Sequence, residues 1–237
     1  MKNILRDFCN AMLFRLVKIL NTIQLFFQLD LKLLKTYAPN AFSTEKDLKQ
    51  DERESYGRLK AITEFLPVEK KLTTLDIGCN LGFFTFNMAK YGGFSIGLDY
   101  GRNEMLAAKA LAQKYQIQNI VFSQIKITPE NCNFLPKTDV VFCLSIYHHW
   151  VRRFGEQKAK EIMSGLTKST IKYFVFDTGQ PNEKNVEWSD CLSFIKPNVD
   201  IWAEKYFMSL GFKEINKLGE FKTSVSKVPR SLFVAKK

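Results

Sequence analysis

The stretch Leu75-Asp-Ile-Gly-Cys-Asn-Leu-Gly-Phe-Phe84 decides the fold of this chain. It starts inside an apolar run at residues 72–77, which is typical of a buried strand, and leads into a helical pattern at residues 83–91. Gly78 permits the tight turn that leaves the strand, and Gly82 permits close approach of the backbone to a ligand where the helix starts. This order of strand, glycine turn and helix predicts a cofactor-binding loop.

Acidic residues narrow the choice of cofactor. Asp99 ends the next predicted strand, where a carboxylate can accept hydrogen bonds from two ribose hydroxyls. A dinucleotide fingerprint reads G-x-G-x-x-G and places a pyrophosphate on the helix N-terminus, whereas here Gly78 and Gly82 are separated by three residues with Asn80 in the middle. Asp76, before the first glycine, would repel a pyrophosphate and would suit a ligand with a sulfonium and an α-amino group. The pattern therefore favours S-adenosylmethionine over a dinucleotide.

Outward from this loop, short apolar runs alternate with helical patterns. Strands are expected at residues 72–77, 94–98, 120–125, 139–146 and 173–177, and helices at residues 83–91, 103–115 and 155–166. Such alternation implies a parallel sheet with helices on both faces. After a helix at 199–210, strands at 212–218 and 231–235 lie too close for a crossover helix, so they should form an antiparallel hairpin. We predict an α/β fold: a seven-stranded, mostly parallel sheet with helices on both faces and a C-terminal antiparallel hairpin strand.

An N-terminal amphipathic helical extension precedes this domain. At 100° per residue, residues 2–36 gather polar side chains on one side and apolar ones on the other, and they contain 6 basic and 2 acidic residues. Such a helix can cover the domain as a lid, lie on a membrane surface or form a dimer contact, and the sequence leaves these three readings open. A second helix is expected at 44–65. We place the extension at residues 1–52 and the cofactor-binding domain at residues 53–237.

The chain is basic, with 35 Lys and Arg against 24 Asp and Glu and a net charge of +11. A basic surface attracts nucleic acid, anionic lipid or a phosphorylated small molecule, but no Lys/Arg run forms a nucleic-acid arm. The five cysteines form no C-x-x-C pair, so neither a metal site nor a disulfide framework is expected. Charges at Arg15 and Lys18 interrupt the first apolar stretch, which argues against a signal peptide and a spanning helix. We expect a cytoplasmic protein, peripheral on the membrane if the first helix lies there.

The segment LDIGCNLGFFTFNMA, at residues 75–89, resembles motif I of the class I, Rossmann-like S-adenosylmethionine-dependent methyltransferases. SIGLDYG, at 95–101, resembles the acidic end of their second strand, and LGFKEINKLGE with RSLFVAKK is similar to the helix and hairpin that end their fold. The resemblance covers roughly residues 53–237 and implies methyl transfer from S-adenosylmethionine.

The resemblance also implies a set of cofactor contacts. It places Asp76, Gly78, Asn80 and Gly82 around the methionine moiety, Asp99 on the ribose and Tyr100 beside the adenine. Further contacts are expected from neighbouring positions of the same strands and loops: Cys79, Phe83, Phe84, Lys126, Ile127 and Leu144. One position departs from the family, because Lys126 stands about where an acidic residue often contacts the adenine amino group.

The tract after the fourth strand, residues 144–153, supplies the candidates for acceptor chemistry. His148 and His149 are the only histidines of the chain, and a neutral imidazole can take a proton from an acceptor hydroxyl near pH 7. The tract resembles a segment of many small-molecule methyltransferases, which favours His149 over His148 as the catalytic residue; a capping or packing role is the alternative. Further acceptor contacts are expected from side chains that can stack or bind an anion: Tyr147, Trp150, Arg152 and Arg153, with Asp177 and Gln180 after the fifth strand as secondary candidates.

These features predict O-methylation of a small, glycan-like or lipid-linked anionic acceptor, with no metal. The alternatives are methylation of RNA, at its end, ribose or base, and a non-catalytic cofactor-binding partner subunit. No Asn/Asp-Pro-Pro-Tyr segment follows the fourth strand, which disfavours methylation of exocyclic amines in nucleic acid. The sequence carries no signal for the oligomeric state.

Overall fold

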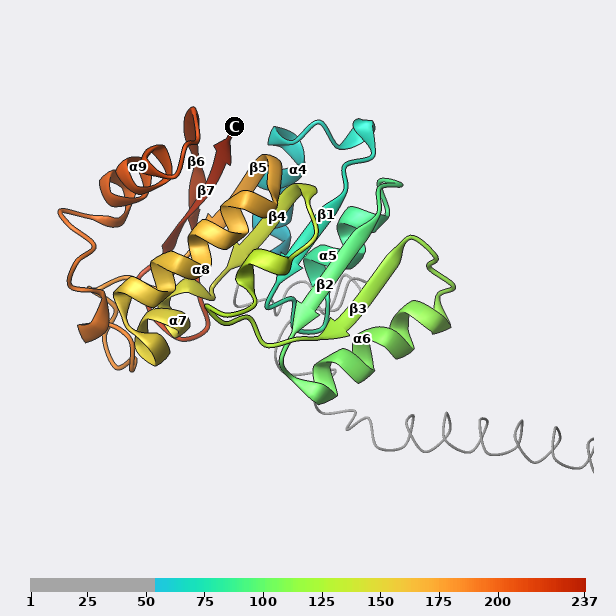
Figure 1. Cartoon of the computed structure of the whole chain (residues 1–237), viewed down its shortest axis with the longest axis horizontal. Helices are drawn as coiled ribbons and strands as arrows, with labels where there is room; N and C mark the ends of the chain where they lie inside the picture. The colour runs from blue at the N-terminus through green and yellow to red at the C-terminus, as the bar shows by residue number, and fades with distance from the viewer. Residues whose placement is uncertain (1–53) are drawn as a thin grey trace, which may run out of the picture. The chain divides into compact units, whose positions relative to one another are not determined.

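A computed structural model describes residues 54–237 and contains the predicted sheet (Figure 1). Its seven strands lie in the order β3-β2-β1-β4-β5-β7-β6. Neighbours among the first five are parallel, whereas β7 is antiparallel to both β5 and β6. The strands are β1 (Thr74–Ile77), β2 (Ser95–Asp99), β3 (Ile120–Gln124), β4 (Thr138–Leu144), β5 (Thr170–Asp177), β6 (Glu214–Phe221) and β7 (Arg230–Lys236). The predicted fold class is confirmed.

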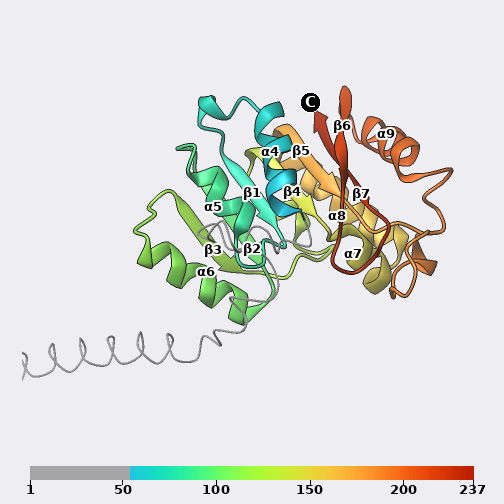
Figure 2. The same ribbon diagram turned by 180° about the vertical axis from the view of Figure 1, so that it is seen from behind.

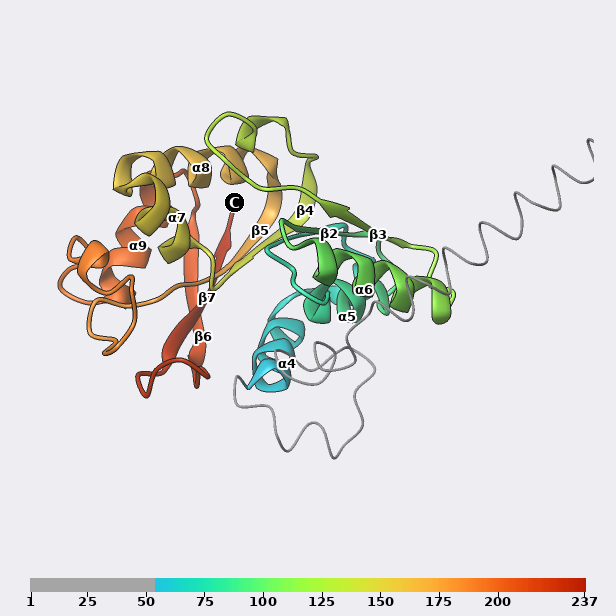
Figure 3. The ribbon, with the colours of Figure 1, turned by 90° about the horizontal axis from the view of Figure 1, so that it is seen from below.

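Helices cover both faces of this sheet, which is why its central strands are apolar on both sides. In β4, Val140 and Phe142 pack on one face with helices α4 and α5, while Val141 and Cys143 pack on the other with α7, α8 and α9. Figure 1 shows α8 in front of the sheet and α4 behind it, Figure 2 shows the reverse from the other side, and Figure 3 shows the two layers from below. The helices are α4 (Ser55–Phe65), α5 (Phe83–Ala89), α6 (Arg102–Lys114), α7 (Tyr147–Phe154), α8 (Glu156–Ser169) and α9 (Val199–Ser209), with short 3-10 turns η1 (Val68–Lys70), η2 (Cys132–Phe134) and η3 (Asp190–Leu192).

The predicted fourth strand extends too far. Strand β4 ends at Leu144, because Ser145 adopts a positive φ of 57° and turns the chain away from the sheet. Helix α7 then begins at Tyr147, directly after the two residues, 145 and 146, that were predicted to continue the strand. The candidate acceptor residues therefore lie on a helix at the carboxyl edge of the sheet.

The topology brings distant segments to this carboxyl edge. Strands β1, β2, β4 and β5 are parallel and end there together. Because β7 runs antiparallel to β5, with Phe233 opposite Phe176, its first residue, Arg230, lies near the end of β5. Ligands of open α/β sheets bind at this edge, so the fold collects there the residues from which a site can be built.

The predictions for residues 1–52, and for the start of the helix expected at 44–65, lie outside the described residues. Within residues 54–237, no helix is both long and apolar enough to cross a membrane.

Candidate functional site

The loop after β1, residues 78–82, is shaped by three residues with left-handed backbone conformations. Gly78, Asn80 and Gly82 have φ values of 70°, 51° and 81°. A Cβ atom on Gly82 would lie 2.6 Å from the Phe122 ring, so this position requires glycine for both its conformation and its space. The backbone amides of Gly78 and Cys79 donate to the carbonyl oxygen of Leu98 at 2.7 and 3.1 Å, which ties the loop to β2.

Asp99 completes this cofactor loop from the end of β2. Its Oδ2 accepts the Asn80 amide at 2.9 Å, and its Oδ1 accepts the Gly101 amide at 2.8 Å. Each carboxylate oxygen has a second lone pair, so the group can also accept from two ribose hydroxyls. The side-chain Oδ1 of Asn80 is buried without a hydrogen-bond partner among residues 54–237. An unsatisfied acceptor next to a carboxylate suits a ligand rich in N–H and O–H donors, and S-adenosylmethionine is one.

Asp76 supplies negative charge from beneath the loop. Its side chain is 3% exposed, and its Oδ2 accepts the Thr85 hydroxyl at 2.6 Å. Burial raises the pKa of Asp76 to about 6; hydrogen bonds from the side chain and backbone of Thr85 oppose this shift, Asp99 adds to it and Arg58 opposes it. The carboxylate is therefore ionised above about pH 6, where it attracts a sulfonium or an ammonium group. These residues fit the predicted cofactor.

The other predicted cofactor residues are spread around the same edge. Tyr100 follows Asp99 and is 73% exposed, so its ring is free to lie against a flat ligand group. The Lys126 side chain is exposed, and its carbonyl oxygen accepts Nδ2 of Asn131 at 2.9 Å, so the third strand offers no carboxylate. The remaining predicted contacts are buried apolar side chains, and their contact with the cofactor stays a prediction: Cys79, Phe83, Phe84, Ile127 and Leu144.

Helix α7 separates the two histidines by environment. His148 is buried, and its Nδ1 accepts the Gly179 amide at 2.9 Å, so a neutral His148 carries its proton on Nε2. Burial, with Arg230 and His149, lowers the pKa of His148 well below its usual value. His149 is exposed, and its ring packs on His148 at 4.2 Å between centroids. Desolvation first, then Arg230 and Arg152, lower its pKa below 6.5, which keeps this accessible imidazole neutral at pH 7.

The other candidates on α7 divide between core and surface. Tyr147 and Trp150 are buried in the core between the sheet and α8 and α9, so neither ring offers a face on which an acceptor could stack. Both side chains therefore lie in the core and not in the predicted acceptor site, because α7 turns them towards the sheet. Arg152 and Arg153 are exposed; Arg152 pairs with Glu187 at 2.5 Å, and the Arg153 guanidinium lies 5.5 Å from the Phe154 ring centroid.

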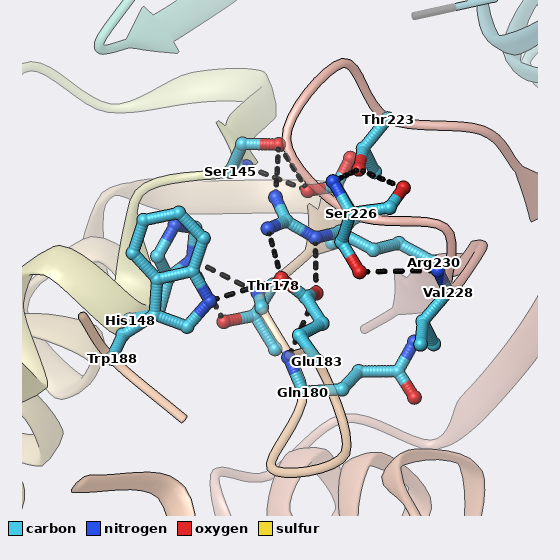
Figure 4. A network of polar contacts seen from close by, with 12 residues as sticks. Ser145, His148, Thr178, Gln180, Glu183, Trp188, Thr223, Ser226, Val228 and Arg230 are labelled. Carbon is cyan, nitrogen blue, oxygen red and sulfur yellow. Dashed lines mark hydrogen bonds and ion pairs between the residues drawn. The ribbon is translucent and has the colours of Figure 1, made fainter. Parts of the chain in front are cut away.

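A network of buried polar residues, not predicted from the sequence, lies beside the histidines (Figure 4). Arg230 forms a two-pronged ion pair with Glu183, with Nε to Oε1 at 2.7 Å and Nη2 to Oε2 at 2.8 Å. The Trp188 indole donates to Oε2 of Glu183 at 3.0 Å and packs on His148 at 4.4 Å between ring centroids. No periodicity or motif marks these residues, since they come from a loop and from the start of a strand.

A second, partly buried ion pair joins helix α4 to the end of β5. Arg58, on α4, donates from Nη1 to Oδ2 of Asp177 at 2.6 Å. Oδ1 of Asp177 accepts the Ser145 amide at 2.7 Å and the Ser145 hydroxyl at 2.8 Å. Asp177 is therefore occupied within the protein, as is Gln180, whose Nε2 donates to the Pro229 carbonyl at 2.8 Å. Within residues 54–237, no group of three or more His, Cys, Asp and Glu side chains could hold a metal ion.

Comparison with known sequences agrees with this geometry. A methyltransferase-domain family model matches residues 68–185. The chain is 24% identical over 204 residues to the O-antigen chain terminator bifunctional methyltransferase/kinase WbdD of Escherichia coli, covering 77% of this chain and 25% of that protein. It is 25% identical over 213 residues to the tRNA U34 carboxymethyltransferase of Campylobacter jejuni, covering 81% of this chain and 67% of that one. The chain thus spans only a quarter of the length of WbdD.

Comparison with solved structures gives the same fold. A crystal structure of WbdD superposes with a TM-score of 0.71 at 24% identity, over 87% of this chain and 46% of that one. Magnesium protoporphyrin IX methyltransferase from Synechocystis, crystallised with bound S-adenosylmethionine, superposes with a TM-score of 0.57 at 16% identity, over 77% and 76% of the two chains. At these identities the likeness shows the fold, and the second structure shows it together with the cofactor.

Proposed function

Because this chain is a class I S-adenosylmethionine-dependent methyltransferase, we propose that it methylates a hydroxyl oxygen on a small, glycan-like or lipid-linked anionic acceptor. One observation carries the proposal: the exposed, neutral His149 stands on the same helix as the exposed Arg152 and Arg153. An imidazole that can take a proton, close to cations that can bind an anion, suits an alcohol with a nearby phosphate or carboxylate.

The chemistry assigns separate tasks to the residues of this edge. The cofactor supplies an electrophilic methyl group on a sulfonium. The cofactor loop holds it through Asp99, the Asn80 side chain and the charge of Asp76. The acceptor oxygen attacks the methyl carbon in line with the departing sulfur, a new C–O bond forms, and the electrons of the C–S bond remain on sulfur as a neutral thioether. His149 takes the hydroxyl proton, so charge and atoms balance.

Among the relatives, WbdD supports a glycan-linked acceptor by its description as an O-antigen chain terminator. A second candidate is RNA, which the tRNA U34 carboxymethyltransferase and the net charge of +11 favour. The two differ in what they require of the surface. RNA binding uses many phosphate contacts and weakens steeply with salt, whereas a small anion needs only the one or two arginines of α7.

A transfer screen with methyl-labelled cofactor tests the proposal. The full chain is incubated with RNA, lipid extract and glycan fractions, and acid-stable label is counted in each. We expect label in the glycan or lipid fraction, and much less of it with the Asp99→Ala variant, which should bind the cofactor more weakly. Label in the RNA fraction alone would overturn the proposal in favour of the second candidate.

We also propose that residues 1–36 bring the protein to an anionic membrane surface, where a lipid-linked acceptor would be concentrated. Their 6 basic and 2 acidic residues and their amphipathic pattern support this. Flotation with phosphatidylserine vesicles checks it: the full chain should float, and a chain that begins near Thr44 should not. A full chain that stays at the bottom of the gradient would contradict membrane association.

A further inference from the structure

The buried ion pair between Arg230 and Glu183 has no part in the chemistry described so far. Glu183 lies in the loop after β5 and is 2% exposed, and Arg230 is buried at the start of β7. Besides the two prongs from Arg230, the Glu183 carboxylate accepts the Gln180 amide on Oε1 at 3.0 Å and the Trp188 indole on Oε2 at 3.0 Å. Four donors therefore satisfy one carboxylate, which fixes its position completely.

Trp188, which donates to the Glu183 carboxylate, also contacts both histidines. The indole packs on His148, and it meets His149 edge-on at 5.3 Å between ring centroids. Gly179 makes the close packing possible, because a Cβ atom there would lie 2.5 Å from Nε1 of Trp188 and 3.0 Å from Cγ of His148. The guanidinium of Arg230 lies 5.5 Å from the Trp188 ring centroid. The indole is thus held by a hydrogen bond on its edge and by a cation over its ring.

Arg230 also forms a hydrogen bond with a residue that follows β4. Its Nη1 donates to the Ser145 hydroxyl at 3.3 Å (Figure 4). Ser145 in turn donates to Asp177, the partner of Arg58. Stability alone does not call for such an arrangement, because apolar side chains of similar size stabilise a core as well as a buried ion pair does. An ion pair with directional partners on two sides is instead suited to fixing the geometry between them.

We propose that the Arg230–Glu183 pair is a positioning device of the acceptor site, which fixes Trp188 against the histidines and so determines where the His149 imidazole stands. The pair acts through other residues and need not touch the acceptor. The inference rests on the proposed function only in that His149 serves the acceptor. The contacts themselves involve the protein alone, and a measurement on the free protein can therefore test them.

Because of the charges around His149, we expect its pKa to shift in opposite directions when Arg230 and Glu183 are replaced. Arg230 and Arg152 face His149 as cations, Glu187 faces it as an anion, and His148 beside it is neutral. Replacing Arg230 by Gln removes a nearby cation and should raise the pKa of His149. Replacing Glu183 by Gln leaves the Arg230 cation without its partner and should lower it. If the pair served only general packing, both variants would shift the pKa in the same direction. Loosening the site exposes the imidazole and moves its pKa towards the ordinary value in either variant.

The test is a histidine titration by NMR on the full chain, which is clean because the chain contains only two histidines. We expect Arg230→Gln to raise and Glu183→Gln to lower the pKa of the exposed imidazole, each by about half a pH unit or more. Lys172→Met is the matched control: it removes an ion pair with Asp139 in another part of the sheet and should leave the titration unchanged. Shifts of the same sign in both variants, or no shift in either, would overturn the proposal.

Trp188→Phe provides a second test of the proposal if Arg230→Gln or Glu183→Gln does not fold. It retains an aromatic ring against the histidines but loses the donor to Glu183 and part of the ring area of the indole. We expect a changed pKa of His149 in the free protein and, with the acceptor found in the screen, a fall in kcat of at least tenfold with unchanged cofactor affinity. An unchanged His149 pKa would refute the positioning role. Because the titration needs no acceptor, its failure is distinct from failure of the proposed function, which shows only in the screen.

Discussion

The cofactor loop and the acceptor side, by which we mean His148, His149 and the polar network around Arg230, occupy the same edge of one sheet but are assembled differently. The cofactor loop is closed by neighbours in sequence: Thr85 lies nine residues from Asp76, and Asp99 lies 19 from Asn80. The acceptor side is closed over long distances: Glu183 and Arg230 lie 47 positions apart, and Asp177, which accepts from Ser145 of this network, lies 119 positions from its partner Arg58. A local segment can thus build the cofactor site, whereas the acceptor site depends on the whole fold.

The two regions also differ in charge. Two carboxylates, Asp76 and Asp99, serve the cofactor loop, and burial keeps the pKa of Asp76 high. On the acceptor side, each buried carboxylate is matched by an arginine, and the imidazoles are kept neutral. An anionic environment for a cationic cofactor therefore adjoins one in which a neutral base meets an anionic acceptor. Each prediction below should affect one region and spare the other.

The largest effect is expected on the acceptor side. His149→Ala should lower turnover by about 10²–10⁴-fold, because the acceptor hydroxyl loses the base that takes its proton. In the unmodified enzyme the rate should fall as the pH drops through the pKa of His149, which lies below 6.5, and this limb of the pH–rate profile should vanish in the variant. Steady-state kinetics on the acceptor fraction from the screen measure both. Full activity in His149→Ala together with a loss of activity in His148→Ala would show that His148, and not His149, takes the proton.

A glycine substitution should damage the cofactor loop next most strongly. Gly82→Ala places a methyl group against Phe122 and forces a left-handed residue, at a combined cost of about 2–5 kcal/mol. Gly211→Ala is the matched control, since Gly211 has a similar φ of 88° with no atom within 4 Å of the added Cβ. It should cost only about 1–2 kcal/mol. Denaturant unfolding gives both free energies of unfolding. Equal losses in the two variants would mean that the contact between the added methyl group and Phe122 contributes nothing.

Asp99→Ala should weaken S-adenosylmethionine binding at least tenfold, because the ribose loses hydrogen bonds to a charged acceptor worth about 1.5–3 kcal/mol each. Asp99→Asn should lie in between, since an amide keeps one oxygen acceptor but turns a donor towards the Asn80 or Gly101 amide. Equilibrium binding of labelled cofactor ranks the three proteins. Unchanged affinity in Asp99→Ala would place the ribose elsewhere.

The smallest effect concerns pH and Asp76. Its pKa is raised from 3.8 to about 6, so the free protein is destabilised as the pH rises through this range and the buried group ionises. A cationic ligand prefers the ionised form. Affinity for S-adenosylmethionine should therefore fall as the pH drops below about 6, by up to about tenfold per pH unit. S-adenosylhomocysteine lacks the sulfonium charge and should show a weaker dependence. Parallel curves for the two ligands would show that Asp76 does not respond to the sulfonium.

The contrast between the two regions also explains what sequence alone could predict. The β1 loop and Asp99 were predictable because glycines with positive φ and an acidic strand end leave a pattern within 25 residues. The pair of Glu183 and Arg230 was not, because a single Glu in a loop and a single Arg before a strand look like surface charges until the fold buries both. Tyr147 and Trp150 were misplaced for a related reason: the turn at Ser145, which directs them into the core, has no glycine or proline to mark it.

The separation of the two regions can be measured directly by calorimetric titration of S-adenosylmethionine into the unmodified chain, His149→Ala and Asp99→Ala. The structure predicts the same dissociation constant for the first two proteins, because His149 lies on α7 beside the acceptor network, and at least a tenfold weaker one for Asp99→Ala. If His149→Ala loses cofactor affinity as Asp99→Ala does, the histidine belongs to the cofactor site, and the division of this edge into two regions is wrong.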